Sequence, residues 1–413
     1  MSVVPRSTVP WRNRTVQVVL ASTLVAPLGV PLVAPALPVV RDQFGLTDPQ
    51  ASLLVSAYFL VGIIVSPFIG LLADRIGRKR VLVPALVIFS LTGLAGYVAP
   101  DYLALLVLRG IQGTAAAALF VTTVTIIGDL FEGARRNAVL GANIAALSLG
   151  AAVFPVLGGA LAAVAWNTPF LAYALGLPVA LFALWALDDA PSDHRETTTE
   201  ERGEPTDKAR LGYLRGVLLA LTPTMGGLLA TAFITEFLLF GALVTALPFM
   251  MTATYALTPL YVGLIITAVE VGAILAAGMS GRLARVFRNG QLLGLGFVCY
   301  GIGLTGVYLA PSPAFVALAV LVFGCGLGIS MPAVDAAVSD QVTRDFRAGL
   351  LGLRNSTTFL GRATGPIAFA AAAAVSGYRP LMAVAAATVL GGAVITLLVT
   401  RWTVTPSEPE PSA

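Results

Sequence analysis

Charged residues are scarce in this sequence, making up 11% of its 413 residues, whereas soluble domains carry about 25%. Hydrophobic residues account for 57%, and the mean hydropathy is +0.88. Such a composition excludes an ordinary soluble protein and predicts an integral membrane protein.

Histidine and cysteine, two common metal ligands, are also scarce. The one histidine, His194, lies in a polar stretch, and Cys299 and Cys325 lie in separate apolar runs. Two such cysteines make neither a disulfide framework nor a metal site. The sequence also lacks an HExxH motif, a nucleophile with a nearby base and a glycine-rich phosphate loop. We therefore expect no cofactor, and neither an enzyme nor a receptor.

Polar interruptions are short, and apolar runs of about 20 residues, the length of a helix that crosses a bilayer, fill almost the whole sequence. Strand-like alternation is absent, which favours helices over a β-barrel. The first run is about 25 residues long, which favours a membrane span over a signal peptide. The twelve predicted spans are residues 16–40, 51–73, 81–99, 102–128, 138–165, 168–187, 222–249, 259–281, 291–310, 314–339, 348–375 and 380–400.

The basic residues are distributed unequally between the two sides of these spans. Twenty of the 25 Lys and Arg residues fall on the side of the N-terminus, two (Arg41 and Arg379) on the other side, and three within spans. Lys and Arg in short loops are retained in the cytoplasm, so both termini are predicted to be cytoplasmic. The basic charge then faces anionic lipid headgroups and is no sign of nucleic-acid binding.

One long polar stretch separates the first six spans from the last six. We predict an N-terminal half (1–187), a cytoplasmic linker (188–215) and a C-terminal half (216–413). Sliding the sequence against itself by 211 positions aligns Gly70 with Gly281, Asp129 with Asp340, Gly150 with Gly361 and Pro155 with Pro366. The predicted fold class is therefore all-α, with twelve transmembrane helices in two six-helix pseudo-repeats, an architecture found in one large class of secondary transporter.

Four segments resemble a known family. The segment "GLLADRIGRKRVL" at 70–82 resembles the loop signature of the major facilitator superfamily. The segments "PLVAPALP" at 31–38, "LRGIQGTAAAA" at 108–118 and "GAAVFPVLGG" at 150–159 resemble signatures of its 12-span drug/proton antiporters. In the last segment Phe154 replaces a glycine of the signature, and "GRATGP" at 361–366 repeats the pattern more completely. The resemblance covers essentially the whole chain and implies the major facilitator fold.

The loop signature concentrates one acid and four bases within seven residues. The bases hold the loop in the cytoplasm, and Gly77 supplies a turn. Asp74 needs a cationic partner or a helix end. The resemblance implies that Asp74 closes a cytoplasmic latch between the halves in the outward-facing state, with local capping as the alternative. The expected latch residues are Gly70, Asp74, Arg75, Gly77, Arg78 and Lys79.

Charges inside the hydrocarbon layer are costly and mark candidate functional sites. The resemblance implies that spans 1, 4, 7 and 10 line a cavity and that spans 2, 5, 8 and 11 form the seam between the halves. Glu270 and Arg362 then lie along the seam, where they could form a structural ion pair. The expected cavity and proton-coupling residues are Arg109, Gly113, Glu236 and Glu270. The expected seam-packing residues are Gly150, Pro155, Gly158, Gly159, Gly361, Arg362, Gly365 and Pro366.

These residues predict a secondary active transporter, a proton-coupled antiporter that exports small amphipathic or drug-like compounds. We favour Glu236 as the proton carrier because its span lines the cavity, whereas Glu270 has Arg362 as a possible partner. Arg109 would repel cations or weaken proton binding at a nearby acid. In the alternative, a uniporter or symporter of a small metabolite, Arg109 would bind an anionic substrate. The expected partners are the substrate, H+ and the lipid bilayer, with no nucleic acid, and we expect a monomer in the plasma membrane.

Overall fold

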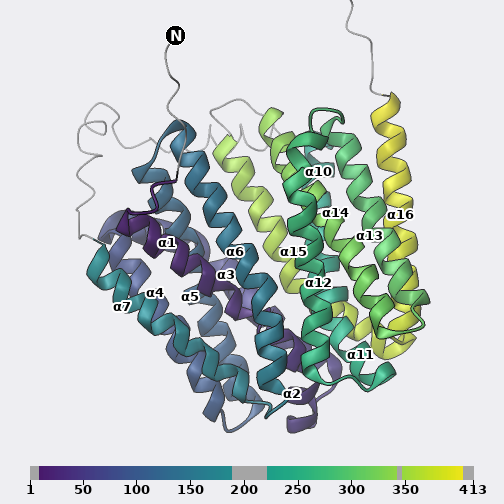
Figure 1. Ribbon diagram of the computed structural model, residues 1–413, viewed down its shortest axis with the longest axis horizontal. Coiled ribbons are helices and arrows are strands. Elements are labelled where there is room, and N and C mark those ends of the chain that lie inside the picture. The colour runs from purple at the N-terminus through teal and green to yellow at the C-terminus, as the bar shows by residue number, and fades with distance from the viewer. Residues whose placement is uncertain (1–8, 188–220, 342–346, 403–413) are drawn as a thin grey trace, which may run out of the picture.

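The structure is a computed structural model that describes residues 9–187, 221–341 and 347–402, and every regular element in these ranges is a helix (Figure 1). Residues 9–187, the N-terminal half, contain α1 (Arg14–Val25), η1 (Ala26–Gly29), η2 (Ala34–Ala36), α2 (Leu37–Phe44), α3 (Asp48–Ile76), α4 (Arg78–Ala95), η3 (Gly96–Val98), α5 (Tyr102–Leu130), α6 (Gly133–Ala162), η4 (Thr168–Leu175) and α7 (Gly176–Ala186). The predicted linker, 188–215, lies outside the described residues.

The C-terminal half follows the same plan. It contains α10 (Pro223–Leu238), η6 (Leu239–Ala246), α11 (Leu247–Tyr255), α12 (Pro259–Leu283), α13 (Asn289–Leu309), α14 (Pro313–Asp340), α15 (Arg347–Ser376) and α16 (Tyr378–Trp402). Among the described residues, eleven helical segments are long and apolar enough to cross a membrane, and a shorter apolar segment, Tyr378–Val394, stands at the twelfth predicted span. The all-α membrane fold class is confirmed.

Several predicted spans are not continuous α-helices. Span 3 ends in the 3-10 helix η3 and span 6 begins with the 3-10 helix η4, but spans 1 and 7 depart furthest from a regular α-helix. Span 1 is broken into α1, η1, η2 and α2, because prolines recur through "APLGVPLVAPALP" and each removes a backbone hydrogen-bond donor. In span 7, the π-helix η6 separates α10 from α11. Such π-helical turns are frequent at functional sites, and η6 contributes Phe240 to the site described below.

Local sequence signals fix the ends of the long helices. At the start of α3, Gln50 and Thr47 form a capping box, and the Thr47 amide donates to Gln50 Oε1 at 2.8 Å. At its other end, Gly77 adopts a φ of +97°, which a residue with a side chain rarely tolerates. The turn expected at Gly77 is therefore present, and α4 begins directly after it.

The repeat detected in the sequence reappears in side-chain contacts. Arg78 Nε donates to Asp129 Oδ2 at 3.0 Å, and Asn289 Nδ2 donates to Asp340 Oδ2 at 3.2 Å. The two pairs are related residue by residue by the offset of 211. Each ties the start of the third span of its half to the end of the fourth.

The halves lie side by side and meet along two pairs of helices, α6 with α12 and α3 with α15 (Figure 1). We call these two contacts the seams. Helix α1 begins and α16 ends at one end of the bundle, here called the terminal end, and α2 and α11 lie at the other, the distal end. The candidate site lies between these two seams, because α12 carries Glu270 and α15 carries Arg362.

Candidate functional site

The halves are joined at the distal end. The Tyr378 hydroxyl at the start of α16 donates to the carboxylate of Asp48 at the start of α3. Asp48 also pairs with Arg41 of α2 at 2.8 Å, and the Arg41 guanidinium lies 5.5 Å from the centroid of the Phe249 ring of α11. From the sequence, Arg41 was predicted only to be one of two bases on the external side. The position of Asp48 and Tyr378 at the starts of two spans was the available signal for this contact.

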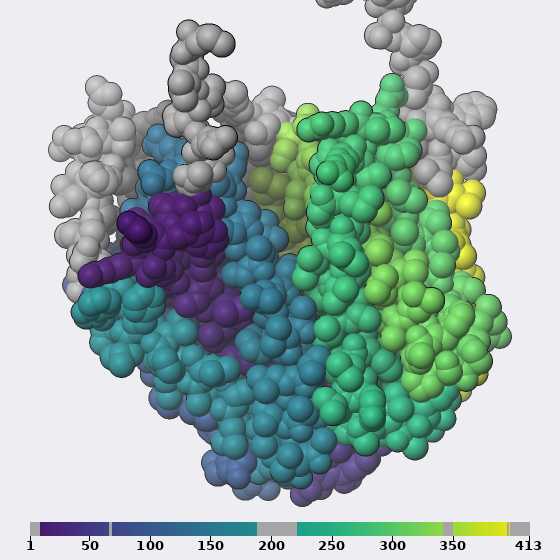
Figure 2. All heavy atoms as spheres, in the orientation of Figure 1, coloured from purple at the N-terminus to yellow at the C-terminus, as the bar shows by residue number. Residues whose placement is uncertain are grey.

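The halves stand apart at the terminal end. Four glycines of the seam helices, Gly70, Gly141, Gly281 and Gly352, face open space there, since a β-carbon built on any of them would have no heavy atom within 4 Å outside its own helix. Figure 2 shows a recess between the halves at this end. The structure is therefore closed at the distal end and open at the terminal end.

A bidentate ion pair lies between these two ends. Arg362 of α15 donates from Nε to Glu236 Oε2 and from Nη2 to Glu236 Oε1, both at 2.9 Å. The side chain of Glu236 is 4% exposed and that of Arg362 is 28% exposed. The pairing of Arg362 with Glu270 that the sequence left open is wrong, because the guanidinium gives its hydrogen bonds to Glu236. A bidentate geometry of this kind is both strong and directional.

Three phenylalanine rings surround the Arg362 guanidinium. The ring centroids of Phe59, Phe240 and Phe359 lie 5.8, 5.3 and 5.4 Å from it. Phe59 belongs to α3, so the N-terminal half supplies part of the surroundings of an ion pair held by the C-terminal half. Phe59 also packs edge-on against Phe240, with centroids 4.9 Å apart. Apolar rings on this side limit the access of water, which strengthens the pair.

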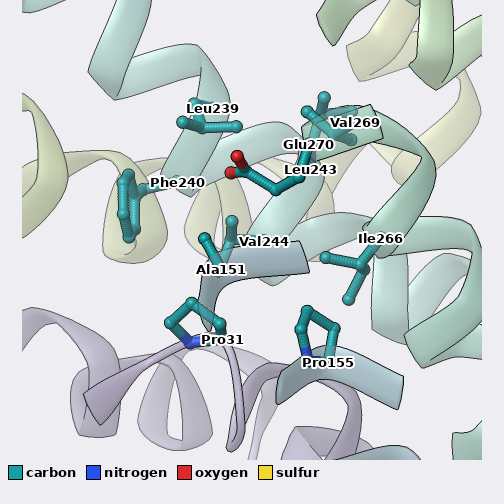
Figure 3. Close-up of a pocket in the computed structure, with 10 residues that line it drawn as sticks. All are labelled: Pro31, Ala151, Pro155, Leu239, Phe240, Leu243, Val244, Ile266, Val269 and Glu270. Atoms are coloured by element: carbon teal, nitrogen blue, oxygen red, sulfur yellow. The ribbon is translucent and has the colours of Figure 1, made fainter. Parts of the chain in front are cut away.

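Glu270 of α12 points into a small pocket between the halves (Figure 3). Nine other residues line the pocket, all apolar: Pro31, Ala151, Pro155, Leu239, Phe240, Leu243, Val244, Ile266 and Val269. Within the described ranges the Glu270 carboxylate makes no hydrogen bond, but it interacts electrostatically with Glu236 and Arg362. The pocket has a volume of about 40 Å³, more than the roughly 10 to 15 Å³ that one water molecule needs. A carboxylate placed here has room for water or a proton and no fixed partner.

Arg109 does not face the space between the halves, contrary to expectation. Its side chain is 1% exposed inside the N-terminal half. Its guanidinium donates to the Leu54 carbonyl at 3.1 Å, to the Gly29 carbonyl and to Gln112 Oε1 at 2.7 Å, and lies 4.6 Å from the Tyr58 ring centroid. These acceptors satisfy the cation without a carboxylate, so Arg109 joins α5 to α3 and to the broken span 1.

Gly113, the other residue expected at the cavity, also packs within the N-terminal half. A β-carbon at Gly113 would lie 1.9 Å from the Tyr58 carbonyl oxygen, so the missing side chain allows α5 to approach α3. Sequence reasoning assigned both residues to the cavity from the span that carries them. The structure shows that this face of α5 turns toward its own half.

The glycines expected at the seam divide into two sets. Gly150 and Gly158 of α6 pack against the Leu24 and Leu32 carbonyls of span 1, and Gly361 and Gly365 of α15 pack in the same way against the Phe233 and Phe237 carbonyls of span 7. These four contacts lie within a half, which corrects the expectation. Contact between the halves comes from Gly159, which faces the Pro259 carbonyl of α12, and from Gly263 of α12, which faces the Pro155 carbonyl. Pro366 occupies in α15 the place of Pro155 in α6.

The expected latch residues lie at the open terminal end. Asp74 pairs with Arg78 at 2.6 Å, one helical turn further along the chain, and Arg78 also pairs with Asp129 of α5. These contacts lie within the N-terminal half, as the local alternative requires. Arg75 and Lys79 flank the same turn. A latch that closes in the outward-facing state stays a prediction, because the halves are apart at this end here.

In the described part of the chain, eleven membrane-length helices and a shorter twelfth form two matching halves, closed at one end and open at the other around buried charges. This arrangement is that of a membrane transporter. The model of the Major Facilitator Superfamily matches residues 19–252 and 228–413. The chain belongs to this superfamily, and it is a multi-pass membrane transporter, not an enzyme.

Two curated relatives and one solved structure illustrate the similarity. The chain is 27% identical over 370 residues to the bacillibactin exporter of Bacillus subtilis, covering 84% of this chain and 87% of that one. It is 28% identical over 236 residues to the quinolone resistance protein NorA of Staphylococcus aureus, covering 56% of this chain and 59% of that one. The crystal structure of the nucleoside transporter NupG superposes with a TM-score of 0.75 at 13% identity, covering 94% of this chain and 99% of that one. The last similarity concerns the fold alone.

Proposed function

We propose that this protein is a proton-coupled antiporter that exports small amphipathic compounds by alternating access. The observation that carries the proposal is the Glu270 carboxylate, which has no hydrogen-bond partner among the described residues and lies in an apolar pocket between the halves. Burial disfavours the ionised form of a carboxyl group. A carboxyl without a fixed cation is therefore free to take up and release a proton during transport.

The geometry supports a division of labour between the two buried acids. Glu236 is held by two hydrogen bonds to Arg362 and so has a fixed cationic partner, whereas Glu270 has no hydrogen-bond partner among the described residues. We therefore assign the exchangeable proton to Glu270, whereas the sequence favoured Glu236. Arg362 lies within electrostatic reach of both acids, so the charge on Glu270 acts on the ion pair.

The direction of transport and the class of substrate rest on the relatives. The relative named as a bacillibactin exporter is similar to most of this chain. The relative named as a quinolone resistance protein is similar to about half of it. The phenylalanine rings around Arg362 suit a substrate with an apolar body. We place the protein in the plasma membrane as a monomer, with both termini in the cytoplasm. The terminal end then faces the cytoplasm. The structure then represents the state that receives substrate.

The experiment is transport by purified protein in liposomes, with a fluorescent quinolone as the probe. Probe accumulation against its gradient is expected only when a pH gradient is imposed, and a protonophore should abolish it. Glu270→Gln should lose this accumulation but keep exchange of probe across the membrane. Asp335→Asn, which alters an ion pair whose acid is 53% exposed, serves as the matched control and should transport normally. Equal accumulation by the wild type with and without the gradient would contradict proton coupling and support a uniporter.

A further inference from the structure

The seam between α6 and α12 closes only part of the way along the two helices. From the distal end, Gly159 meets the Pro259 carbonyl and Gly263 meets the Pro155 carbonyl. Next, Thr267 Oγ1 donates to the Ala152 carbonyl at 2.7 Å, a hydrogen bond that joins the two halves. Glu270 follows Thr267 by about one turn and shares its pocket with Ala151 of α6. Going from the distal end toward the terminal end, Glu270 thus follows Thr267 as the next polar residue of α12 at this seam.

Between Glu270 and the terminal end, glycines of both helices lack a neighbour across the seam among the described residues. On α12, Gly278 and Gly281 face open space, and on α6 the same holds for Gly141. The pocket therefore lies at the fork where the closed part of the seam gives way to the open terminal end. A contact formed or lost at a fork changes how far the seam is closed.

The α6 side of the pocket includes Ala151, whose backbone carbonyl lacks its usual helical donor. Pro155 has no amide hydrogen, so it cannot donate to the carbonyl of Ala151 four residues earlier, as a residue of any other type would. Buried carbonyl groups are nearly always hydrogen-bonded in folded proteins. The neighbouring Ala152 carbonyl already accepts from Thr267 across the seam, which shows that α12 can reach the carbonyls of α6 at this level.

The α12 side of the pocket offers a donor only when Glu270 is protonated. The charged groups that act on Glu270 are Glu236 of α10 and Arg362 of α15, and the hydrogen bonds of Arg362 go to Glu236. The residues that span 1, α6 and η6 contribute to the pocket are apolar. A protonated carboxyl group carries one O–H donor, whereas a carboxylate only accepts.

We propose that protonated Glu270 donates a hydrogen bond to the Ala151 carbonyl and thereby clamps α12 to α6 at the fork of the seam. When Glu270 is ionised, two acceptors face each other and the clamp is released. This inference rests on the proposed function, because it takes Glu270 as the residue that exchanges a proton. It adds the partner of that proton and a role for Pro155, which leaves the Ala151 carbonyl available.

The clamp has a definite direction. It adds a contact to the seam as it stands in the conformation closed at the distal end, so protonation stabilises that conformation. A single net hydrogen bond shifts a two-state equilibrium by about 3- to 10-fold. Lowering the pH is therefore expected to raise the ratio of terminal-open to distal-open molecules by about that factor. In an antiporter, this returns the protonated carrier to the side where substrate is loaded.

The test measures the distance between the seam helices at the terminal end as a function of pH. Spin labels are placed at Ile144 of α6 and Met279 of α12, which are 63% and 53% exposed, in a variant without the native cysteines. Distance distributions are recorded by double electron–electron resonance in lipid nanodiscs between about pH 5 and pH 9. No substrate is added, so the readout is independent of transport.

Pro155→Ala is the decisive variant, because its new amide hydrogen can bond to the Ala151 carbonyl within α6. It is expected to lose the pH-dependent shift. Pro84→Ala, which removes the proline inside α4 away from the seam, is the matched control and should keep it. A full pH response in Pro155→Ala would overturn the clamp.

A second pair of variants covers the case in which Pro155→Ala does not fold. Glu270→Gln retains a donor at every pH and should stay in the low-pH distribution, whereas Glu270→Ala has none and should stay in the high-pH distribution. Identical distributions for the two would also overturn the clamp. Failure of the proposed function is distinguishable, because it would appear as wild-type liposomes that do not use a pH gradient, whatever the distances show.

Discussion

The Glu236–Arg362 ion pair allows a quantitative test of how the site is held together. Its two hydrogen bonds are both 2.9 Å, and Glu236 is almost completely buried. Removing one partner of a buried pair costs about 3–5 kcal/mol, because the remaining charge loses its compensation. The 28% exposure of Arg362 lets water relieve part of this penalty. We therefore expect the lower end of the range, about 3 kcal/mol, for Arg362→Gln, which leaves the buried Glu236 carboxyl group without its cation.

A double-mutant cycle separates the pair from the other contacts of its members. Glu236→Gln leaves Arg362 among its phenylalanine rings and near Glu270, so its cost should be smaller, about 2 kcal/mol. The double variant should cost less than the sum of the single variants, with a coupling of about 2 kcal/mol. The free energy of unfolding is measured by tryptophan fluorescence during titration with SDS in mixed micelles.

The ion pair between Asp335 and Arg354 is the control. Its atoms are 3.0 Å apart, but the side chain of Asp335 is 53% exposed, so the same cycle should give a coupling of about 0–1 kcal/mol. If the costs at Glu236 and Arg362 simply add, or if both pairs couple equally, the pair does not hold the site together as the geometry implies.

Four further outcomes follow from other contacts. A cysteine at Gln43 should react with an impermeant thiol reagent on intact cells, and a cysteine at position 200 should not; the reverse labelling would contradict the topology. Asp74→Asn should slow transport in liposomes without unfolding the protein, because the outward-facing state loses its latch, and unchanged turnover would remove that role. Tyr378→Phe removes a hydrogen bond across the distal end. The rate at which an external thiol reagent labels a cysteine placed between the halves should therefore rise about 3- to 10-fold. Arg109→Lys should cost about 3 kcal/mol of stability because one ammonium group cannot reach all the acceptors of the guanidinium, and a loss of transport at normal stability would restore a cavity role.

The sequence predicted the helices, their number and their repeat because these depend on composition and spacing. The length of a bilayer-spanning helix, the offset of 211 and the turn at Gly77 are all properties of the chain read in one dimension. The breaks in span 1 were visible as prolines, but their exact geometry depends on what packs against each break. The broken backbone then became the binding partner of Arg109, through the Gly29 carbonyl.

Pairing between helices was harder to predict, because depth in the membrane does not give the direction in which a side chain points. Glu236 and Glu270 lie at similar depth, so the sequence could not decide which of them meets Arg362. The rotation of α10, α12 and α15 about their axes decides it, and that rotation is set by close contacts such as Gly361 against the Phe233 carbonyl. The prediction that Arg109 faces the cavity was wrong because it assumed that a buried guanidinium needs a carboxylate. Backbone carbonyls can accept its hydrogen bonds instead.

The repeat is symmetric in its scaffold and asymmetric in its charges, so the two seams carry different chemistry at equivalent positions. Ala151 and Arg362 are equivalent positions, each four residues before the proline of its helix. In the C-terminal half this position carries the guanidinium that holds Glu236, and in the N-terminal half it carries Ala151, an uncharged residue that lines the pocket of Glu270. A ligand shifts a conformational equilibrium only by the difference in its affinity for the two states. The proposed clamp gives the Glu270 carboxyl group such a difference, because the hydrogen bond to the Ala151 carbonyl forms only where the seam between α6 and α12 is closed at this level.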